Sequence, residues 1–447
     1  MPATKTPTTP VRVAFVSLGC PKNLVDSENL LGSLDPERFA LSADPAEADV
    51  AVINTCAFLE AAREEAVETI LEMVRLKSSG DLAGVVVAGC IVTRHADELR
   101  AEIPEVDEFL AFSDYATLPE VCLKAAGRDA PPVSTTADFA NVRLPLTLSH
   151  TGYLKVSEGC GHSCSFCLIP KIRGGLVSRS TEDLLAEARA RVEAGAVELN
   201  LIGQDLTEWG RDRPGPRRLP DLLRDLAGIG GLRWIRLMYA YPALVSDALM
   251  REMAGNDRVV KYLDMPVQHA AKGVLARMKR GFDSARLRDL IRRLRETVPG
   301  LVLRTTVLVG HPGETAEDHA ELLDFLTDVR FDHLGAFTFS PEEGTDSAEQ
   351  DDPVPPETAA ERYHEVMALQ QDITFARNRD RVGETVECIV DGPTEEPGVQ
   401  LGRTFGDAPE IDGSVLIRGD GLEAGSIGAV RVTGADGYDL EGDWLGP

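Results

Sequence analysis

The sequence predicts an α/β protein in three parts, the last of which is a small all-β barrel. Three Val- and Ile-rich runs separated by helical stretches open the chain, and six further strands alternate with helices in its middle. A glycine-rich segment of short strands closes it. Alternating strands and helices indicate parallel sheets, and short turn-rich strands indicate a barrel. The length of 447 residues suits two or three such domains.

The first part is predicted to be a parallel α/β domain over residues 11–127, after a polar tail, residues 1–10, that we expect to be disordered. Its strands are predicted at residues 11–20, 48–56 and 83–90. Continuous apolar runs of this kind are typical of strands buried on both faces.

Each of these three strands ends in a cysteine, namely Cys20, Cys56 and Cys90. The carboxyl ends of parallel strands share one edge of a sheet, and ligands bind there. We therefore expect the three thiols to converge and to act as metal or cluster ligands. The alternative is three buried structural cysteines, because cysteine is among the most buried residue types.

A linker rich in Pro, Thr and Ala is predicted at residues 128–145, followed by a domain over residues 146–377. A full eight-unit barrel would need two more strands than this domain has, so the pattern predicts an open (β/α)6 partial barrel. The six predicted strands lie at residues 153–157, 197–202, 234–239, 262–266, 301–309 and 334–339. A helix over 356–378 closes the domain, and the small barrel is predicted over residues 378–447.

The loop after the first of these strands carries Cys160, Cys164 and Cys167, spaced C-x3-C-x2-C. Thiols grouped this tightly bind a metal or an iron–sulfur cluster far more often than they fill a core. With His162 as a fourth ligand the loop would hold zinc. Without it, three thiolates would hold a four-iron cluster with one iron open. The two remaining cysteines, Cys122 and Cys388, are expected to be ordinary buried residues.

Composition narrows the class of protein. Eight cysteines in so long a chain are too sparse for a disulfide scaffold, which favours reduced thiols and a cytoplasmic location. No apolar run is long enough to span a membrane. A net charge of −27 argues against a broad nucleic-acid-binding surface.

These features together resemble the methylthiotransferase family of radical S-adenosylmethionine (SAM) enzymes, over nearly the whole chain. The matching strings are LGCPKN (18–23), NTC (54–56), AGC (88–90), EGC through CLIP (158–170) and VGHPGE (309–314). Phe166, directly before the last loop cysteine, also fits the pattern. The C-terminal barrel resembles the family's TRAM domain.

The resemblance implies that Cys160, Cys164 and Cys167 hold a [4Fe–4S] cluster whose open iron binds SAM. It implies a second [4Fe–4S] cluster on the strand-end cysteines, and a 5′-deoxyadenosyl radical as the hydrogen-abstracting species. The SAM contacts it implies are Phe166, Gln204, Asp205, Gly310 and Glu314. For the last four, a turn or a helix cap is the alternative. Lys171, Arg173 and Arg179, which follow the loop, are candidates to balance thiolate charge or to bind the SAM carboxylate, with a solvated surface as the alternative.

The family has a branch that modifies a tRNA adenosine and a branch that modifies an aspartate of small-subunit ribosomal protein S twelve. The strings at 18–27 and 407–413 resemble the second branch. That branch implies methylthiolation of the aspartate β-carbon, with two SAM molecules and a sulfur donor, on a protein that is free or in the ribosome. An electron donor such as a flavodoxin or ferredoxin is also implied. A tRNA methylthiotransferase and a non-catalytic, metal-bearing RNA-binding adaptor are the alternatives.

Charge supports the protein substrate. Residues 378–447 contain fifteen Asp and Glu, five Arg and no Lys, a net charge of −10. An RNA-binding barrel gains affinity from cations that displace counterions, so this barrel suits a basic protein partner better than nucleic acid.

Overall fold

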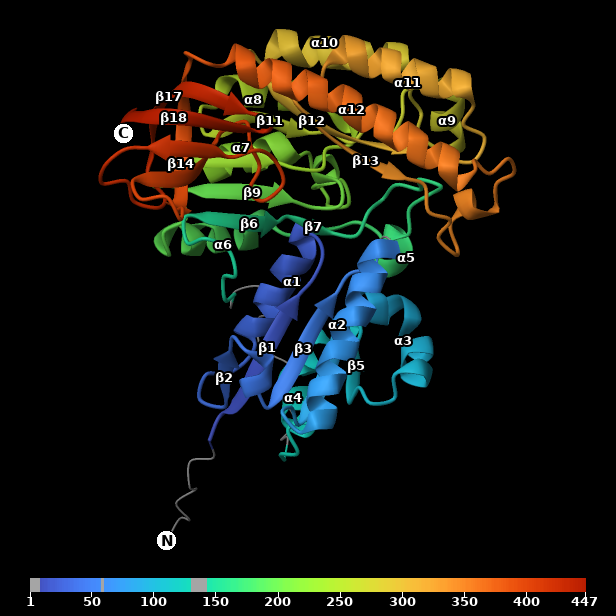
Figure 1. Ribbon diagram of the computed structural model, residues 1–447, viewed down its shortest axis with the longest axis vertical. Helices are drawn as coiled ribbons and strands as arrows, with labels where there is room; N and C mark the ends of the chain where they lie inside the picture. Colours follow the sequence, from blue (N-terminus) through green and yellow to red (C-terminus); the bar gives the residue numbers. More distant parts are fainter. Residues whose placement is uncertain (1–8, 58–59, 130–142) are drawn as a thin grey trace. The chain divides into compact units, whose positions relative to one another are not determined.

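In the computed structural model of the protein, the chain forms two compact units (Figure 1). The first comprises residues 1–146 with 171–173, and the second comprises residues 147–170 with 174–447. The residues that the structure describes are 9–57, 60–129 and 143–447.

Two of the sequence-based expectations fall mostly outside the described residues. They are the disordered tail, residues 1–10, and the linker, residues 128–145. Within the described ranges, no helix is both long enough and apolar enough to cross a membrane.

The first unit is built on a five-stranded parallel sheet with the order β2-β1-β3-β4-β5. Its strands are β1 (Val11–Ser17), β2 (Phe39–Ser42), β3 (Val50–Thr55), β4 (Gly84–Gly89) and β5 (Glu108–Leu110). Its helices are α1 (Pro21–Gly32), α2 (Glu60–Ser79), α3 (Cys90–Glu102) and α4 (Leu118–Ala125). The three predicted strands are confirmed as β1, β3 and β4.

Every residue of β3 and β4 is buried, which explains their unbroken apolar runs. One set of alternating side chains, including Val50, Val52 and Val86, packs in a single core with Leu30 of α1 and Leu118 of α4. The edge strands β2 and β5 have only four and three residues. They are too short to leave a pattern, and the sequence did not predict them.

The second unit contains a six-stranded sheet with the order β13-β12-β11-β10-β9-β6, in which neighbouring strands are parallel. Its strands are β6 (Thr151–Lys155), β9 (Glu198–Ile202), β10 (Trp234–Leu237), β11 (Val259–Asp264), β12 (Val302–Val309) and β13 (His333–Thr338). The strands follow their sequence order and the sheet does not close. The open (β/α)6 partial barrel is therefore confirmed.

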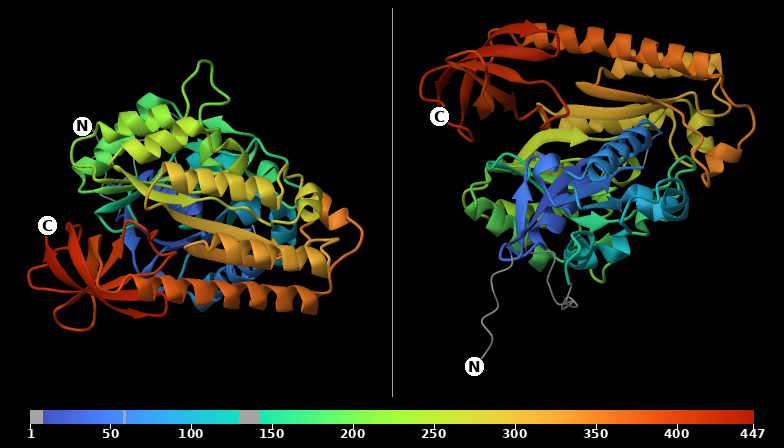
Figure 2. Two further views of the ribbon diagram at one scale, coloured as in Figure 1. Left: turned by 90° about the horizontal axis from the view of Figure 1, so that it is seen from above. Right: turned by 60° about the horizontal axis from the view of Figure 1, so that its bottom comes forward.

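The crossover helices of this unit cover the sheet (Figure 2). They are α6 (Thr181–Glu193), α7 (Leu219–Ala227), α8 (Asp247–Gly255), α9 (Lys272–Arg277), α10 (Ser284–Thr297) and α11 (Ala316–Val329). A short hairpin, β7 (Ser157–Glu158) with β8 (Val177–Ser178), brackets the cysteine loop and α5 (Ile169–Arg173). The Ser180 hydroxyl caps α6 by accepting from the backbone N–H of Asp183.

The long helix α12 (Pro356–Asp380) leads directly into the small barrel, as Figure 2 shows. This barrel is closed in the order β14-β15-β16-β18-β17, which confirms the predicted all-β barrel. Its strands are β14 (Thr385–Pro393), β15 (Val399–Thr404), β16 (Val415–Arg418), β17 (Ile427–Asp436) and β18 (Asp439–Gly446). Cys388 lies in the barrel core and Cys122 in the core of the first unit, and both are fully buried as expected.

Buried charges fasten the small barrel to the partial barrel. Glu198, the first residue of β9, is fully buried and accepts from Arg403 Nη2 at 2.9 Å and from Arg236 Nη2 at 3.0 Å. Burial acts to raise the pKa of Glu198, but the two guanidinium groups outweigh it and lower that pKa to about 2. Arg403 also donates from Nε to Asp391 at 2.7 Å.

These contacts place the small barrel at the amino-terminal end of the sheet. Glu198 and Trp234 begin their strands, and Trp234 donates to Glu387 of β14 at 2.8 Å. His333, which begins β13, donates to the carbonyl of Gly406 at 2.9 Å. In barrels of this kind the amino-terminal end serves stability, and the chemistry lies at the opposite end.

We predict that Arg403→Met destabilises the second unit by about 3–5 kcal/mol, because the buried carboxylates of Glu198 and Asp391 each lose a cationic partner. Urea unfolding followed by tryptophan fluorescence measures this unit alone, since all three tryptophans lie in it. The control is Arg418→Met in the same barrel. It breaks a surface pair with Glu396 and should cost less than about 1 kcal/mol. Equal costs for the two variants would contradict the stabilising role of the buried network.

Candidate active site

The strand-end cysteines of the first unit lie on three neighbouring strands. Cys20 precedes the first turn of α1 after β1, Cys56 directly follows β3, and Cys90 is the first residue of α3 after β4. Because β1, β3 and β4 are adjacent and parallel, their carboxyl ends lie side by side. The structure therefore brings the three loops together at one edge of the sheet.

Glycines allow these loops to approach closely. A Cβ on Gly19 would lie 2.5 Å from Cys56 Cβ, and the φ of Gly19 is +89°. A Cβ on Gly89, whose φ is +103°, would lie 2.4 Å from the carbonyl oxygen of Thr55. A hydrogen bond with the Cys56 thiol, followed by burial, raises the pKa of Cys90. The Cys56 and Cys90 thiols are therefore direct neighbours, and the Gly19–Cys20 turn packs against them.

A buried amide network holds the same loops together, and the sequence did not reveal it. Asn23 Nδ2 donates to the carbonyl of Leu18 at 2.6 Å. Asn54 Nδ2 donates to Ser27 Oγ at 2.8 Å and to the carbonyl of Asn23 at 3.1 Å. Asn54 Oδ1 accepts from the Tyr115 hydroxyl at 3.2 Å. The asparagines stand within the matching strings 18–23 and 54–56, but a string alone does not tell which polar groups meet.

Arg173 belongs to the first unit by its contacts. It donates to Asp26 at 2.9 Å, its Nη2 lies 3.6 Å from Cys90 Sγ, and its guanidinium lies 4.3 Å from the centre of the Phe112 ring. Its positive charge acts to lower the pKa of Cys90. Arg179, by contrast, is paired with Glu187 at 2.5 Å. Of these two predicted counter-charges, Arg173 lies beside a candidate ligand.

The cysteine loop of the second unit runs from Cys160 to Cys167 at the carboxyl end of the sheet, after β6 and β7. Ser165 anchors it: its N–H donates to the carbonyl of Met278 at 3.2 Å and its hydroxyl to the carbonyl of Arg277 at 2.7 Å. Phe166 is partly buried and packs against the core of the partial barrel. The loop is therefore fixed at its middle, between Cys164 and Cys167.

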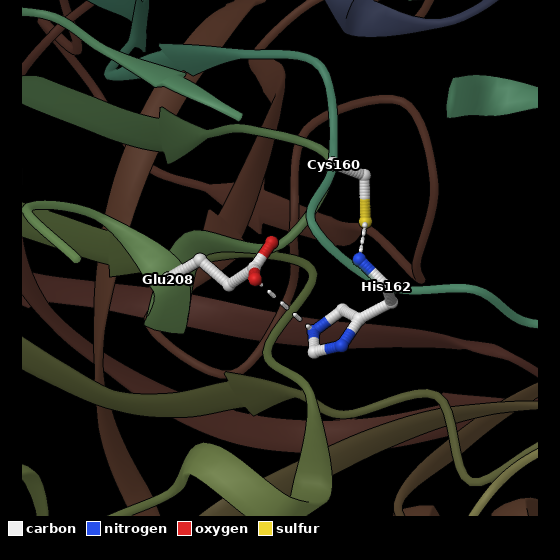
Figure 3. Close-up of side chains that lie close together, drawn as sticks. All are labelled: Cys160, His162 and Glu208. Atoms are coloured by element: carbon white, nitrogen blue, oxygen red, sulfur yellow. Dashed lines mark hydrogen bonds and ion pairs between the residues drawn. The ribbon is translucent and has the colours of Figure 1, made fainter. Parts of the chain in front are cut away.

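Glu208 fixes the beginning of the loop, and the sequence did not single it out. Its Oε2 accepts from the N–H of Gly161 at 2.9 Å, and a Cβ on Gly161 would lie 2.5 Å from its Oε1. Figure 3 shows the Glu208 carboxylate pointing toward the His162 ring, and the Cys160 sulfur pointing toward the backbone N of His162. Ligand atoms of Cys160, His162 and Glu208 lie within 4.8 Å of one another. Within the described part of the chain, this is the one such group able to hold a single ion.

His162 is committed to another partner. Its Nε2 lies 2.7 Å from Asp205 Oδ2, and its ring stacks on Tyr241 with the ring centres 3.9 Å apart. Asp205 Oδ1 accepts from the backbone N–H groups of Thr207 at 2.8 Å and of Tyr241 at 3.2 Å. Asp205 thus caps a turn and orients His162, while Gln204 beside it is partly exposed. That Gln204 and Asp205 contact SAM stays a prediction.

The loop after β12 contains Gly310 and Glu314. Glu314 Oε2 accepts from the N–H of Gly310, and Arg362 Nη1 lies 3.2 Å from Glu314 Oε1. Burial acts to raise the pKa of Glu314, but His269, His319 and Arg362 lower it to about 2. A Cβ on Gly310 would lie 2.5 Å from Ala359 Cβ, so the turn needs a glycine there. Glu314 therefore braces this loop, and its contact with SAM, like that of Gly310, stays a prediction.

Burial is the main cause that raises the pKa of the Cys160 thiol, to about 12, and Glu208 and Cys167 add to the effect. Without a bound cation this thiol is neutral at physiological pH. A metal centre that binds here must supply the positive charge that stabilises the thiolate.

Family models match three successive segments of the chain. "Uncharacterized protein family UPF0004" matches residues 12–111, the radical SAM superfamily matches 154–326, and the TRAM domain matches 382–445. These segments correspond to the parallel α/β sheet, the open partial barrel and the small closed barrel.

Curated relatives match almost from end to end. One from Anaeromyxobacter sp. (strain K) is 48% identical over 96% of this chain and 92% of its own. One from Geobacter sulfurreducens is 42% identical over 97% and 98%, and one from Myxococcus xanthus is 45% identical over 97% and 91%. All three carry the name ribosomal protein uS12 methylthiotransferase RimO.

A solved structure supports the fold. The radical SAM methyltransferase TsrM from Kitasatospora setae superposes with a TM-score of 0.56 at 14% identity, covering 88% of this chain and 81% of that one. The radical SAM family model and the shared name of the curated relatives define an enzyme of the radical SAM methylthiotransferase class. The end-to-end relatives are more specific, and the chain belongs to the RimO family.

Proposed function

We propose that this chain methylthiolates the β-carbon of an aspartate in small-subunit ribosomal protein S twelve, using two SAM molecules and a sulfur donor. The observation that carries the proposal is the match to relatives named ribosomal protein uS12 methylthiotransferase, at up to 48% identity over 96% of the chain. We place the reaction in the cytoplasm, where ribosomal proteins are found and thiols stay reduced. An electron donor such as a flavodoxin or ferredoxin completes the proposed set of partners.

In this proposal the six motif cysteines hold two [4Fe–4S] clusters. Cys160, Cys164 and Cys167 hold one, and Cys20, Cys56 and Cys90 hold the other. Both donor sets fit such a cluster, since each consists of three thiols. The turns that carry them contain Gly19, Gly89 and Gly161, where an added Cβ would overlap a neighbouring residue. Three thiols leave one iron without a protein ligand. The clusters and SAM would supply a carbon radical and the sulfur, chemistry that amino-acid side chains cannot perform.

Thiols that bind different irons of a cluster stand apart, whereas ligands of one ion converge on a point. The three loop thiols do not form such a convergent group among the described residues, where the close group is Cys160 with His162 and Glu208. His162, the fourth ligand that a zinc site in this loop would need, already has its Nε2 bonded to Asp205. These two observations favour a cluster over zinc in the loop.

The chain's own residues hold and orient the site. Glu208 and Ser165 fix the loop at two points, so the spacing of its thiols does not depend on the bound group. Glu314, through Gly310, shapes the loop after β12 at the same end of the sheet. The candidate SAM contacts, Phe166, Gln204, Asp205, Gly310 and Glu314, all follow strands at this carboxyl-terminal end, where barrel enzymes bind their substrates.

The surface of the small barrel supports a protein substrate. Eleven of its fifteen carboxylates are exposed, against three of its five arginines. Of the arginines, Arg403 is buried and paired with Glu198, and the exposed Arg418 pairs with Glu396. Such a surface repels the phosphates of tRNA and attracts a basic ribosomal protein.

The activity is tested with anaerobically purified enzyme, reductant, a sulfide source and SAM. We expect mass spectrometry to find one methylthio group on one aspartate of protein S twelve, and no modified adenosine in tRNA treated in parallel. Cys164→Ser is the matched control and should leave both substrates unmodified. A modified anticodon-loop adenosine with unmodified protein S twelve would overturn the assigned substrate.

Iron analysis tests the two clusters. The wild-type chain should be brown under anaerobic conditions and contain about eight irons, four for each cluster. Replacing Cys160, Cys164 and Cys167 by Ser should leave about four, and so should replacing Cys20, Cys56 and Cys90. Replacing the buried Cys122 and Cys388 by Ala should leave about eight. Colourless protein with stoichiometric zinc would rule out the radical mechanism.

The acidic barrel is tested by neutralising Glu395, Asp420, Glu423 and Asp436 to their amides, since all four are exposed. We expect kcat/KM for protein S twelve to fall about tenfold or more at low salt, with a weaker salt dependence than the wild type, because electrostatic attraction speeds encounter. The matched control neutralises four exposed glutamates of α2, Glu64, Glu65, Glu68 and Glu72. Equal losses in the two variants would contradict a specific role of the barrel.

A further inference from the structure

Arg280 is a buried cation beside the cysteine loop, in the segment after α9. Only 5% of its surface is exposed. Its Nη2 donates to the carbonyl of Pro266 at 2.8 Å, and its Nη1 lies 3.6 Å from Cys164 Sγ. The guanidinium carbon lies 4.4 Å from the centre of the Tyr241 ring. Its Nε is buried and has no hydrogen-bond partner among the described residues.

A buried guanidinium normally has an anionic partner, because it stays protonated and its desolvation is costly. The described residues offer Arg280 no carboxylate. The Tyr241 ring and the Pro266 carbonyl supply a cation–π contact and one hydrogen bond, and neither carries a full negative charge. Among the described groups that contact Arg280, the sulfur of Cys164 is the one that becomes an anion when it ligates a metal centre.

Other cations of the same segment are either paired with a carboxylate or exposed to solvent. Arg277 lies 3.5 Å from Asp352, and Lys279 pairs with Asp346. Arg286 lies over the Phe282 ring and donates to the carbonyl of Gly281 at 2.7 Å, on the exposed surface. Arg280 thus differs from its neighbours in being buried, lacking a carboxylate and facing a loop cysteine.

We propose that Arg280 is a positioning residue whose fixed charge balances the Cys164 thiolate and raises the reduction potential of the cluster held by the loop. This inference rests on the proposed function, because it needs a [4Fe–4S] cluster on Cys160, Cys164 and Cys167. Reduction adds one electron from the low-potential donor to that cluster. A nearby cation and an N–H donor to a ligand sulfur stabilise the more negative, reduced form.

The two ends of the loop then differ in charge. Glu208 and the Asp205–His162 pair lie at the Cys160 end, and Arg280 lies at the Cys164 end. The acidic groups hold the loop backbone and the histidine, whereas the guanidinium contacts a ligand sulfur directly. Removal of Arg280 should therefore change the potential more than removal of a surface arginine of the same segment.

The test measures the midpoint potential of the full-length chain by EPR-monitored dithionite titration, without SAM or substrate. Cys20, Cys56 and Cys90 are replaced by Ser so that one cluster reports. At the midpoint potential of the parent protein, we expect Arg280→Gln to lower the ratio of reduced to oxidised cluster about tenfold, which is about 59 mV for a one-electron couple. Arg280→Lys should recover most of that ratio, and Arg286→Gln should leave it unchanged.

An unchanged potential in Arg280→Gln overturns the proposal, even if SAM binding weakens. A Lys variant that shifts as far as the Gln variant also overturns it. If the Gln variant loses its iron while the Lys variant keeps iron and potential, the charge is required and the proposal stands. Loss of iron from both variants overturns it. Failure of the proposed function appears separately, as a parent protein without iron in the loop or a wild-type enzyme that leaves protein S twelve unmodified.

Discussion

The carboxyl ends of parallel strands share one edge of a sheet, and the loops that carry both cysteine trios lie at such an edge. In the first unit, β1, β3 and β4 are neighbours, so three cysteines separated by more than thirty residues reach one edge. Convergence also needs turns that bring backbone against backbone. Gly19 and Gly89, both with positive φ, meet this need because any side chain there would overlap the next loop.

In the second unit, the groups that stabilise the fold and those of the candidate site lie at opposite ends of the strands. At the amino-terminal end, a fully buried Glu198 joins Arg236 to Arg403, so buried ion pairs attach the small barrel to the partial barrel. At the carboxyl-terminal end, by contrast, the buried guanidinium of Arg280 has an Nε without a hydrogen-bond partner among the described residues. The stability of the amino-terminal end allows the carboxyl-terminal end to keep a buried polar group whose partner we expect a bound cofactor to supply.

Much of the fold could be predicted because its signals are local. The unbroken apolar runs of β3 and β4, the Ser180 cap and the six-strand count all lie within short windows of sequence. Strands of three or four residues, such as β5, leave no such signal. The convergence of the first trio's loops could also be predicted, since each of its cysteines follows a strand of the same sheet.

The rest of the site could not be predicted because it is assembled across long stretches of chain. Glu208 meets Gly161 across 47 residues, and Arg280 meets Cys164 across 116. Each is one of many charged residues in the sequence, and only burial and the identity of its neighbour set it apart. The same limit applies to Asp205, where the sequence predicted a contact with SAM and the structure adds bonds to His162 and to two backbone N–H groups.

Substrate choice must be encoded outside the cluster loops. A radical-generating cofactor in such a loop would suit a tRNA base and an aspartate equally. Hydrogen abstraction depends on the reactivity of the C–H bond, and that bond can belong to a nucleic acid or to a protein. Discrimination between a polyanion and a basic protein requires a charged surface of one sign. In the second unit the small barrel is our candidate for that surface, because its Arg403 is buried against the partial barrel while most of its carboxylates face solvent. The network that stabilises the second unit therefore also removes a positive charge from the surface that would otherwise attract RNA.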